Sequence, residues 1–327
     1  MHLKSLPKTS MPTNLYNNLS GKVALVTGGT GSIGSEIVRQ LLATEVAQIR
    51  VYSRDEHKQY ELGQELGDDA RLRYLIGDVR DKDRLDFAFR GVDVCFHAAA
   101  LKHVPVCEYN PFEAVKTNVV GTQNVIDVSI KHNLEKVIAV STDKAVNPES
   151  VLGASKLMME RLIIAANLIT GSGRTRFSSV RFGNVLNSRG SVVHLWRKQI
   201  AMGGPVTVTD RRAHRFFMEI PEAVKLIFDS MSLMQGGEIF VLKMKEHSIV
   251  EFAEETIRTH ASGKNVELSF IGLRPGEKLH EGLLTAEEMT HTLEMENILI
   301  ILPHADLGPR EYPGAQPAMG NTYVSRS

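Results

Sequence analysis

The chain has 327 residues, 43% of them hydrophobic, and its 38 basic side chains balance 38 acidic ones. This length accommodates one large domain, or a large domain and a small one, with an ample core. Because the charges balance, nothing in the composition predicts binding to nucleic acid or to an anionic membrane surface.

The cysteines and the N-terminal sequence predict the cellular compartment. Two cysteines, Cys95 and Cys107, cannot form a disulfide framework and suit a reducing compartment. Residues 1–20 are polar and lack the apolar core of a signal peptide, and no stretch approaches the roughly 20 apolar residues of a membrane span. We therefore expect a cytoplasmic protein with no membrane partner and with a loose N-terminal arm over residues 1–20.

A glycine-rich turn, Gly28-Gly-Thr-Gly-Ser-Ile-Gly34, follows the first predicted strand (residues 23–27) and precedes an amphipathic helix. Glycines in such a unit allow a tight turn and the close approach of a pyrophosphate, and the helix N-terminus offers unpaired N–H groups. We expect a dinucleotide here, and the glycine spacing resembles that of the extended short-chain dehydrogenase/reductase superfamily. The predicted contacts are Gly28, Thr30, Gly31, Ser32, Ile33 and Gly34.

The second predicted strand, residues 48–52, ends in a segment that bears on the choice between NAD and NADP. NAD enzymes of this kind place an acidic residue near this point for the ribose hydroxyls, whereas an arginine can pair with the 2′-phosphate of NADP. Arg54 precedes Asp55, which favours NADP over NAD. In the alternative, Arg54 is a surface charge and Asp55 binds the ribose. Ser53 and Lys58 are also assigned to the cofactor.

Two further predicted strands, residues 72–76 and 92–96, end in segments that can also face the dinucleotide. Resemblance to the superfamily places Asp78, with its neighbour Val79, beside the adenine. Small residues after the fourth strand let the backbone lie against the cofactor, although plain strand packing would favour them too. We assign Ala98, Ala99 and Ala100 to the cofactor, Lys102 to cofactor and substrate, and His103 to the substrate.

Residues 141–156 carry the candidate chemistry. They follow a predicted buried strand over residues 136–140, and ligands bind at the carboxyl ends of strands in open parallel sheets. Thr142, Asp143 and Lys144 place a hydroxyl, a carboxyl and an amine side by side, a set suited to proton transfer beside a cofactor. Lys156 adds a second amine on a following helix. Taken alone, the tripeptide would equally fit a solvated turn.

Strands and helices alternate up to about residue 182, with long helices predicted over residues 111–132 and 154–170. This alternation predicts an α/β fold with a doubly wound parallel sheet of the Rossmann type. We assign the dinucleotide-binding domain to residues 21–182.

Beyond a sixth strand at residues 178–182 the pattern loosens into short strands (206–209, 239–242, 267–270) and helices (221–234, 249–259). We expect a smaller, discontinuous substrate-binding cap over residues 183–300, with some return to the sheet, and a C-terminal tail over residues 301–327. Arg189, Arg215 and Arg274 could converge on a diphosphate, although ordinary surface arginines would fit the sequence as well.

Several motifs together resemble the UDP-N-acetylglucosamine 4,6-dehydratases of the capsule, lipopolysaccharide and flagellin-sugar pathways. They occupy residues 28–34, 52–56, 97–105, 141–145, 181–185, 215–218 and 273–278, and the resemblance covers about residues 20–290. It implies a UDP-sugar substrate and a tightly held NADP that is recycled in each turnover. We expect a homo-oligomer, and we assign no metal ligand.

The resemblance also implies a reaction. NADP takes a hydride from sugar carbon 4, a base removes the proton on carbon 5, an acid helps the carbon 6 hydroxyl leave as water, and the hydride returns to carbon 6. Asp143 would be the acid and Lys144 the base, Thr142 would bond the carbon 4 oxygen, and Lys156 would hold the nicotinamide ribose. The implied substrate contacts are Lys102, His103, Asn184, Arg189, Ser191, Arg215, Arg274 and Glu277.

Leu152 departs from the superfamily, which has a tyrosine four residues before the lysine. The capsule-type branch has methionine there, so Leu152 is compatible with activity. Because a leucine cannot accept a proton, we predict that Lys144 serves twice, for the carbon 4 hydroxyl and then for carbon 5, with burial and Lys156 lowering its pKa. In the alternative, Thr142 relays the first proton to solvent.

Two other functions stay open. A nucleotide-sugar 4-epimerase shares the fold, the cofactor and the oxidation at carbon 4, but it needs no acid for a leaving water and usually keeps the tyrosine. A catalytically silent NADP-binding sensor would have no need of Asp143 and Lys144. The sequence therefore favours a dehydratase and leaves open whether carbon 5 is inverted or retained.

Overall fold

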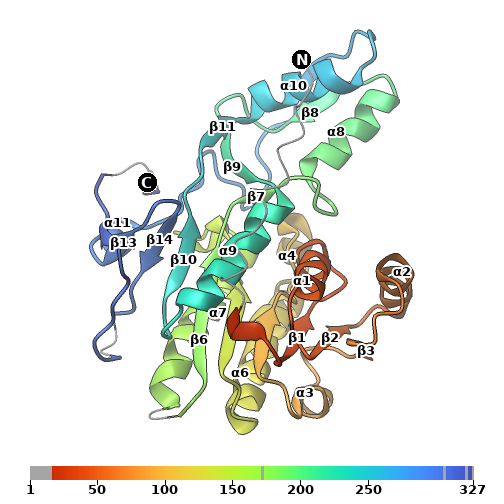
Figure 1. Cartoon of the computed structure of the whole chain (residues 1–327). Helices are drawn as coiled ribbons and strands as arrows, with labels where there is room; N and C mark the ends of the chain where they lie inside the picture. The colour runs from red at the N-terminus through yellow and green to blue at the C-terminus, as the bar shows by residue number, and fades with distance from the viewer. Residues whose placement is uncertain (1–16, 171–172, 305–306, 321–322, 326–327) are drawn as a thin grey trace.

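The computed structural model describes residues 17–170, 173–304, 307–320 and 323–325. A ten-stranded sheet forms its centre, and helices cover both faces of this sheet (Figure 1). Most of the arm expected over residues 1–20 lies outside the described residues, which begin with the short helix Asn17–Leu19.

Seven neighbouring strands of the sheet are parallel, in the order β3-β2-β1-β4-β5-β6-β10. Their bounds are Val23–Thr27 (β1), Gln48–Ser53 (β2), Leu72–Ile76 (β3), Val94–His97 (β4), Lys136–Val140 (β5), Arg176–Arg181 (β6) and Ile239–Leu242 (β10). The central strands are largely buried, as strands covered on both faces require. β1 pairs with both β2 and β4, so the strand order reverses there, and such a reversal opens a ligand crevice at the strand ends. The predicted doubly wound α/β fold is confirmed.

The helices form one layer on each face of the sheet. Ile138 of β5 packs in a core shared with α1 (Ser32–Leu42) and α9 (Ile220–Leu233). Its neighbours Val137 and Ala139 pack in a second core, shared with α3 (Lys82–Phe89), α6 (Gly121–Lys131) and α7 (Val151–Ile169). Because successive residues of a strand face opposite sides, these two cores lie on opposite faces of the sheet.

The structure differs from the prediction over residues 111–132, where the sequence predicts one long helix. After α4 (Val104–Tyr109), α5 (Pro111–Ala114) passes into a π-helical segment, Val115–Val120, before α6 begins. Within it, Asn118 accepts a hydrogen bond from the N–H of Leu101 (2.8 Å) and donates to its carbonyl (3.1 Å) and to Ser155 Oγ (2.9 Å). π-Helical turns often occur at functional sites, and this one fixes the loop that follows β4.

A cap lies at the top of the molecule in Figure 1. Its elements are β7 (Asn184–Val185), α8 (Val192–Ala201), β8 (Val206–Val208), β9 (His214–Met218), β11 (Glu246–Ser248), α10 (Ile249–His260) and β12 (Leu268–Phe270). Trp196 and Ile200 of α8 pack with Ile249 and Ala253 of α10, so the cap has a core of its own.

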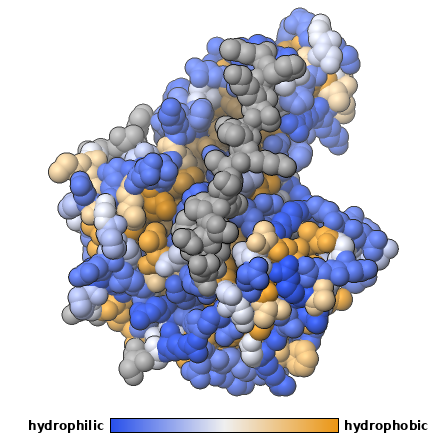
Figure 2. Space-filling model, in the orientation of Figure 1, coloured by the Kyte–Doolittle hydropathy of each residue, from blue (hydrophilic) through white to orange (hydrophobic). Residues whose placement is uncertain are grey.

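The chain then returns to the sheet. After α11 (Ala286–Met289), β13 (Thr292–Glu294), β14 (Ile298–Ile301) and β15 (Gln316–Pro317) extend the sheet by antiparallel pairing beyond β10. On the face shown in Figure 2, hydrophilic residues predominate and hydrophobic ones lie in separate patches. Among the described residues, no helix is both long enough and apolar enough to cross a membrane.

Candidate active site

The glycine loop lies between β1 and the residues that follow β4. Gly28 has a φ of +66°, and a Cβ atom there would lie 2.8 Å from Cα of Ala99. A Cβ atom at Gly34 would lie 2.2 Å from the carbonyl oxygen of Gly28. Neither position accepts a side chain, because backbone atoms cannot move aside as a flexible side chain would. The loop therefore has the compact form in which the N-terminus of α1 can face a pyrophosphate.

Two residues after β2, Arg54 and Asp55, already form contacts within the protein. Asp55 caps α2 (Glu56–Leu66), accepting from the N–H of Lys58 at 3.0 Å and forming an ion pair with its ammonium group. Arg54 lies 3.5 Å from the carboxylate of Asp78 and is 53% exposed. Partial burial would raise the pKa of Asp78, but hydrogen bonds from Arg80 outweigh it and the pKa is lowered.

A cavity of about 410 Å³ opens between the glycine loop and α2. Its lining includes Thr30, Ser35, Arg39, Lys58 and Arg189. Arg189 reaches it from the loop after β7, donating from Nη1 to the carbonyl oxygen of Thr30 (2.9 Å) and from its N–H to Ser32 Oγ (3.0 Å). The structure thus places Arg189 against the glycine loop.

The loop after β5 forms a 3-10 turn, Asp143–Ala145, and holds the predicted acid and base. Thr142 Oγ1 donates to Asp143 Oδ1 at 2.8 Å, and Lys144 Nζ donates to the same oxygen at 3.0 Å. Lys144 Nζ also donates to Asn184 Oδ1 at 3.3 Å. Asp143 is fully buried, and no described residue gives its Oδ2 a hydrogen bond. Because such a buried oxygen is costly to leave unpaired, this atom is placed to accept a bond from a ligand or a water.

Glu281 brings a second carboxylate to Lys144. Its Oε1 lies 3.4 Å from Nζ and its side chain is 3% exposed. Burial alone would lower the pKa of Lys144, but Asp143 and Glu281 outweigh it and the pKa is raised. The prediction that burial and Lys156 lower this pKa is wrong, because Asp143 and then Glu281 raise it by more than burial lowers it, and Lys156 does not contribute. Lys144 is therefore held as a protonated amine.

Lys156, on α7, differs from Lys144 in that its pKa is lowered. Its Nζ donates to the carbonyl oxygen of Val140, the last residue of β5, at 2.7 Å. Burial lowers its pKa to about 8, against the opposing effect of Glu160. An amine fixed at the end of β5 is well placed to bond a ribose hydroxyl.

The loop after β4 meets the loop after β7. Lys102 Nζ lies 3.4 Å from Ser188 Oγ, and desolvation together with Arg189 lowers the pKa of Lys102. The ring of His103 packs so closely on Gly190 that a Cβ atom there would lie 2.4 Å from its Cε1. Ser191 begins α8 as its N-cap. The predicted substrate contacts Lys102 and His103 therefore meet the loop that carries Arg189 and leads into Ser191.

Arg215 of β9 is held by an ion pair with Glu277, with Nη2 2.9 Å from Oε1. Its Nη1 donates to the carbonyl oxygens of His214 (2.8 Å) and Leu279 (3.0 Å). The backbone N–H of Arg274 donates to the same Glu277 at 3.3 Å, while the Arg274 side chain is exposed. The structure thus brings the Arg215 side chain and the backbone of Arg274 to Glu277.

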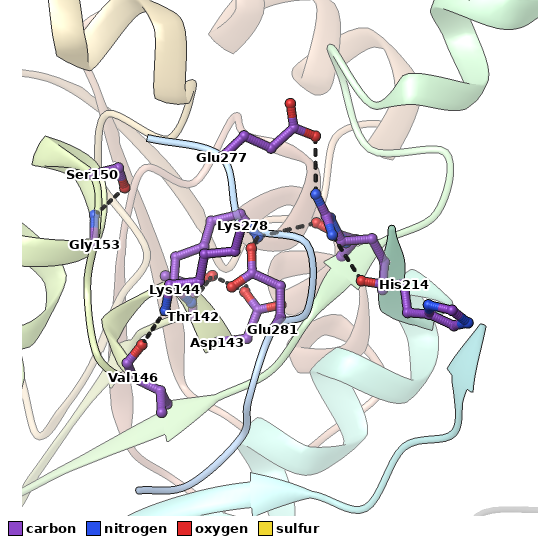
Figure 3. A network of polar contacts seen from close by, with 12 residues as sticks. Thr142, Asp143, Lys144, Val146, Ser150, Gly153, His214, Glu277, Lys278 and Glu281 are labelled. Carbon is purple, nitrogen blue, oxygen red and sulfur yellow. Dashed lines mark hydrogen bonds and ion pairs between the residues drawn. The ribbon is translucent and has the colours of Figure 1, made fainter. Parts of the chain in front are cut away.

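Figure 3 shows how the segment from Glu277 to Glu281 reaches the loop after β5. Lys278 Nζ donates to the carbonyl oxygen of Val146 at 2.7 Å. Glu281, three residues further along the chain, forms an ion pair with Lys144. The carboxylates of Asp143 and Glu281 approach Lys144 from different elements (Figure 3).

Comparison with known proteins identifies the family. The sequence profile of the polysaccharide biosynthesis protein family matches residues 24–303. The chain belongs to this family. An inverting UDP-N-acetylglucosamine 4,6-dehydratase of Campylobacter jejuni is 45% identical over 303 residues, which cover 92% of this chain and 89% of that protein. The predicted resemblance to these dehydratases is confirmed.

Other proteins similar to this chain carry different names. An uncharacterized membrane protein of Methanocaldococcus jannaschii is 52% identical over 296 residues (89% of each chain), and a UDP-glucose 4-epimerase of Rickettsia rickettsii is 42% identical over 272 residues (82% of this chain, 79% of that protein). The X-ray structure of Pen from Bacillus thuringiensis superposes with a TM-score of 0.88 at 42% identity, covering 92% of this chain and 91% of that one.

Leu152 is the residue at which this family member departs from the superfamily that its sequence resembles. It is 3% exposed and packs with Cys107 and Ala114 in a small buried cluster. The position therefore belongs to the packing between α4, α5 and α7, where it presents no proton acceptor.

Sequence reasoning missed three residues of the site in this polysaccharide biosynthesis protein. Asn118 lies in a segment predicted as plain helix, and nothing local marks its role. Lys278 is the last residue of the motif at residues 273–278 and Glu281 lies three residues beyond it, so this motif was the one available signal. Their roles depend on which loop the segment meets in the fold.

Proposed function

We propose that this polysaccharide biosynthesis protein is a nucleotide-sugar 4,6-dehydratase. It converts UDP-N-acetylglucosamine to the UDP-4-keto-6-deoxy sugar and inverts carbon 5, the activity for which its 45%-identical relative is named. The observation that carries the proposal is the buried contact between Asp143 and Lys144, 3.0 Å apart at the end of β5, because loss of water from a sugar needs an acid and a base together.

We propose NADP as the cofactor, bound along residues 21–182, with the sugar nucleotide under the cap of residues 183–300. NADP, when bound, would supply the acceptor for the hydride from carbon 4 and its donor to carbon 6. Gly28 and Gly34 leave the room that a pyrophosphate needs. Arg54 supports NADP over NAD, because Asp55 is engaged in capping α2 and in its ion pair with Lys58.

The hydrogen bonds of the loop after β5 suggest how the first proton moves. Thr142 can accept the carbon 4 hydroxyl proton because its own hydroxyl already donates to Asp143 Oδ1. Asp143 would then hold that proton and deliver it to the departing carbon 6 hydroxyl, which leaves as water. This route gives the first proton to Thr142 and Asp143 in place of Lys144.

Lys144 then acts at carbon 5. Protonation of Asp143 removes one of the two carboxylates that raise the pKa of Lys144, so its proton can pass to Glu281, 3.4 Å away. The neutral amine accepts the carbon 5 proton as the carbon 6 hydroxyl leaves. Glu281 releases to solvent the proton that it took from Lys144, and a solvent proton added to the opposite face of carbon 5 completes the inversion.

A 4-epimerase is the second candidate, since a relative of that name is 42% identical. Incubation with UDP-N-acetylglucosamine in deuterated water, followed by NMR and mass spectrometry, separates the two. A dehydratase gives a product that has lost one water and carries deuterium at carbon 5. An epimerase gives an isomer of unchanged mass without deuterium, and a silent binder returns the substrate unaltered; either result would reject the proposal.

A further inference from the structure

A cluster of metal-ligating side chains lies beside the candidate active site. His214, Glu246 and His280 each offer one donor atom, and these atoms all lie within 4.8 Å of one another. The imidazole rings of His214 and His280 stack with centroids 5.2 Å apart, and His280 Nδ1 lies 3.4 Å from Glu246 Oε1. Across the part of the chain that the structure describes, it is the single such group.

The backbone sets this arrangement. β9 pairs on one side with β11, where Glu246 lies opposite Phe216, and on the other side His214 bridges to His280. His214 is two residues from Phe216, and residues two apart on a strand share a face, so His214 and Glu246 project from the same face of the β9–β11 pair. Three separate segments thus bring their side chains to one point.

The hydrogen bonding of His214 prepares it as a ligand. Its Nδ1 lies 2.7 Å from the carbonyl oxygen of Arg212. A carbonyl only accepts, so Nδ1 carries the hydrogen and Nε2 presents a lone pair. Metal-binding histidines are commonly oriented by a second-shell bond of this kind, from the other ring nitrogen to a backbone carbonyl.

We propose that His214, Glu246 and His280 bind one Zn²⁺ ion. Two imidazole nitrogens and a carboxylate oxygen suit zinc, with a water in the fourth position, whereas Ca²⁺ and Mg²⁺ prefer sites made of oxygens alone. Zinc–nitrogen bonds of about 2.0–2.1 Å require the donors to draw together. All three side chains are partly exposed, so they have room to rotate.

The ion would have a structural role. Figure 3 shows the His214 ring turned away from Lys144, Asp143 and Glu281, so the ion does not face the reacting groups. His214 directly precedes Arg215, and His280 directly precedes Glu281. An ion that joins the two histidines therefore fixes two active-site side chains relative to each other. This consequence rests on the proposed function, whereas binding of the ion does not.

The test uses the full chain without a histidine tag, treated with a chelator and dialysed, and it needs no sugar substrate. We expect one Zn²⁺ per chain by elemental analysis, the visible d–d absorption of tetrahedral Co²⁺ on titration with cobalt, and a higher Tm with equimolar zinc. His214→Ala and His280→Ala should weaken binding by more than about 100-fold, the upper range for loss of a second-shell partner. Glu246→Gln, which keeps the shape of the side chain, should weaken it less.

Two histidines serve as matched controls. His247 is adjacent to Glu246 on β11 but contacts Phe217 instead, and the ring of His304 packs at a tilt against that of His291 near the sheet edge. His247→Ala and His304→Ala should bind zinc as the unaltered protein does. Absence of stoichiometric binding in the unaltered chain would overturn the proposal, and so would equal binding by His214→Ala and His280→Ala. The dehydratase assignment would survive either result.

Discussion

The glycine loop and the cap border the same candidate active site, but different forces hold them. The loop is fixed by backbone packing, as the 2.2 Å approach of a Cβ at Gly34 to the carbonyl of Gly28 shows. In the cap, Arg215 is fixed by side-chain bonds to Glu277, 62 residues away in sequence. An atom added where backbone atoms are packed either fits or overlaps, so its effect is all or none. A network of side-chain bonds can lose one bond while the others remain. We therefore expect abrupt effects in the loop and graded effects in the cap.

The largest effect should come from the loop after β5, which belongs to neither region and supplies the proposed acid and base. Asp143→Asn should lower kcat by about 10²–10⁴-fold, since it removes both the proton acceptor behind Thr142 and the acid for carbon 6. No absorbance of reduced nicotinamide should appear when substrate is added.

Lys144→Ala should differ, with that absorbance rising and then stalling, because Lys144 acts only at carbon 5. If neither variant shows the absorbance, Lys144 also accepts the carbon 4 hydroxyl proton, as predicted from the sequence.

Gly34→Ala tests the abrupt behaviour of the glycine loop. The added methyl group overlaps a carbonyl oxygen, so the protein should lose its retained cofactor, with affinity lower by about 100-fold or more. Gly63→Ala is the matched control, because a Cβ there meets only the Tyr74 ring at an ordinary 3.6 Å and alanine favours helix α2. Cofactor content of the purified variants gives the answer. Equal content in both would show that the loop adapts.

The same contrast explains how far the sequence could predict the structure. The parallel sheet and the glycine loop follow from consecutive residues, whose strand, turn and helix patterns are local. Glu281 and the cluster of His214, Glu246 and His280 are not local, because each contact joins segments more than 30 residues apart that pack only in the folded chain. For this reason the raised pKa of Lys144 and the candidate metal ligands did not follow from the sequence, and the resemblance to a family supplied the roles but not these contacts.

The cap should show graded losses. Arg215→Ala removes a buried ion-pair partner of Glu277 and should raise KM for the UDP-sugar by about 30-fold or more, with kcat at saturation little changed. Arg274→Ala, which removes an exposed side chain, should raise KM less. Steady-state kinetics with substrate above the new KM separates the two constants. A fall in kcat at unchanged KM would give these arginines a part in the chemistry.

Arg54 tests the comparison inside the proposed dinucleotide-binding domain, because it would bind the cofactor through its side chain, whereas the glycine loop nearby is held by backbone packing. Arg54→Ala should weaken NADP by about tenfold while leaving NAD nearly unaffected, because only the 2′-phosphate contact is lost and the residue is half exposed. Binding of each dinucleotide to cofactor-free protein by calorimetry measures both. Equal weakening would mean that Arg54 does not meet the 2′-phosphate and that NAD is the better assignment.

The last effect, at Lys156, is one of stability and of pH. Burial lowers its pKa from 10.5 to about 8, so between these values the folded chain has released a proton that the unfolded chain still binds. Stability contributed by Lys156 must then rise with pH in this window, by at most about 1.4 kcal/mol per pH unit, and stay constant below it. Buried tyrosines and cysteines with raised pKa values act in the opposite direction, but they are common to the protein and to Lys156→Met and cancel in the difference between them. Urea unfolding of both proteins from pH 7 to about pH 10 measures that difference. Parallel curves would mean that Lys156 keeps its charge in the folded chain. Its pKa would then not be lowered, and the contrast with Lys144, whose pKa is raised, would be lost.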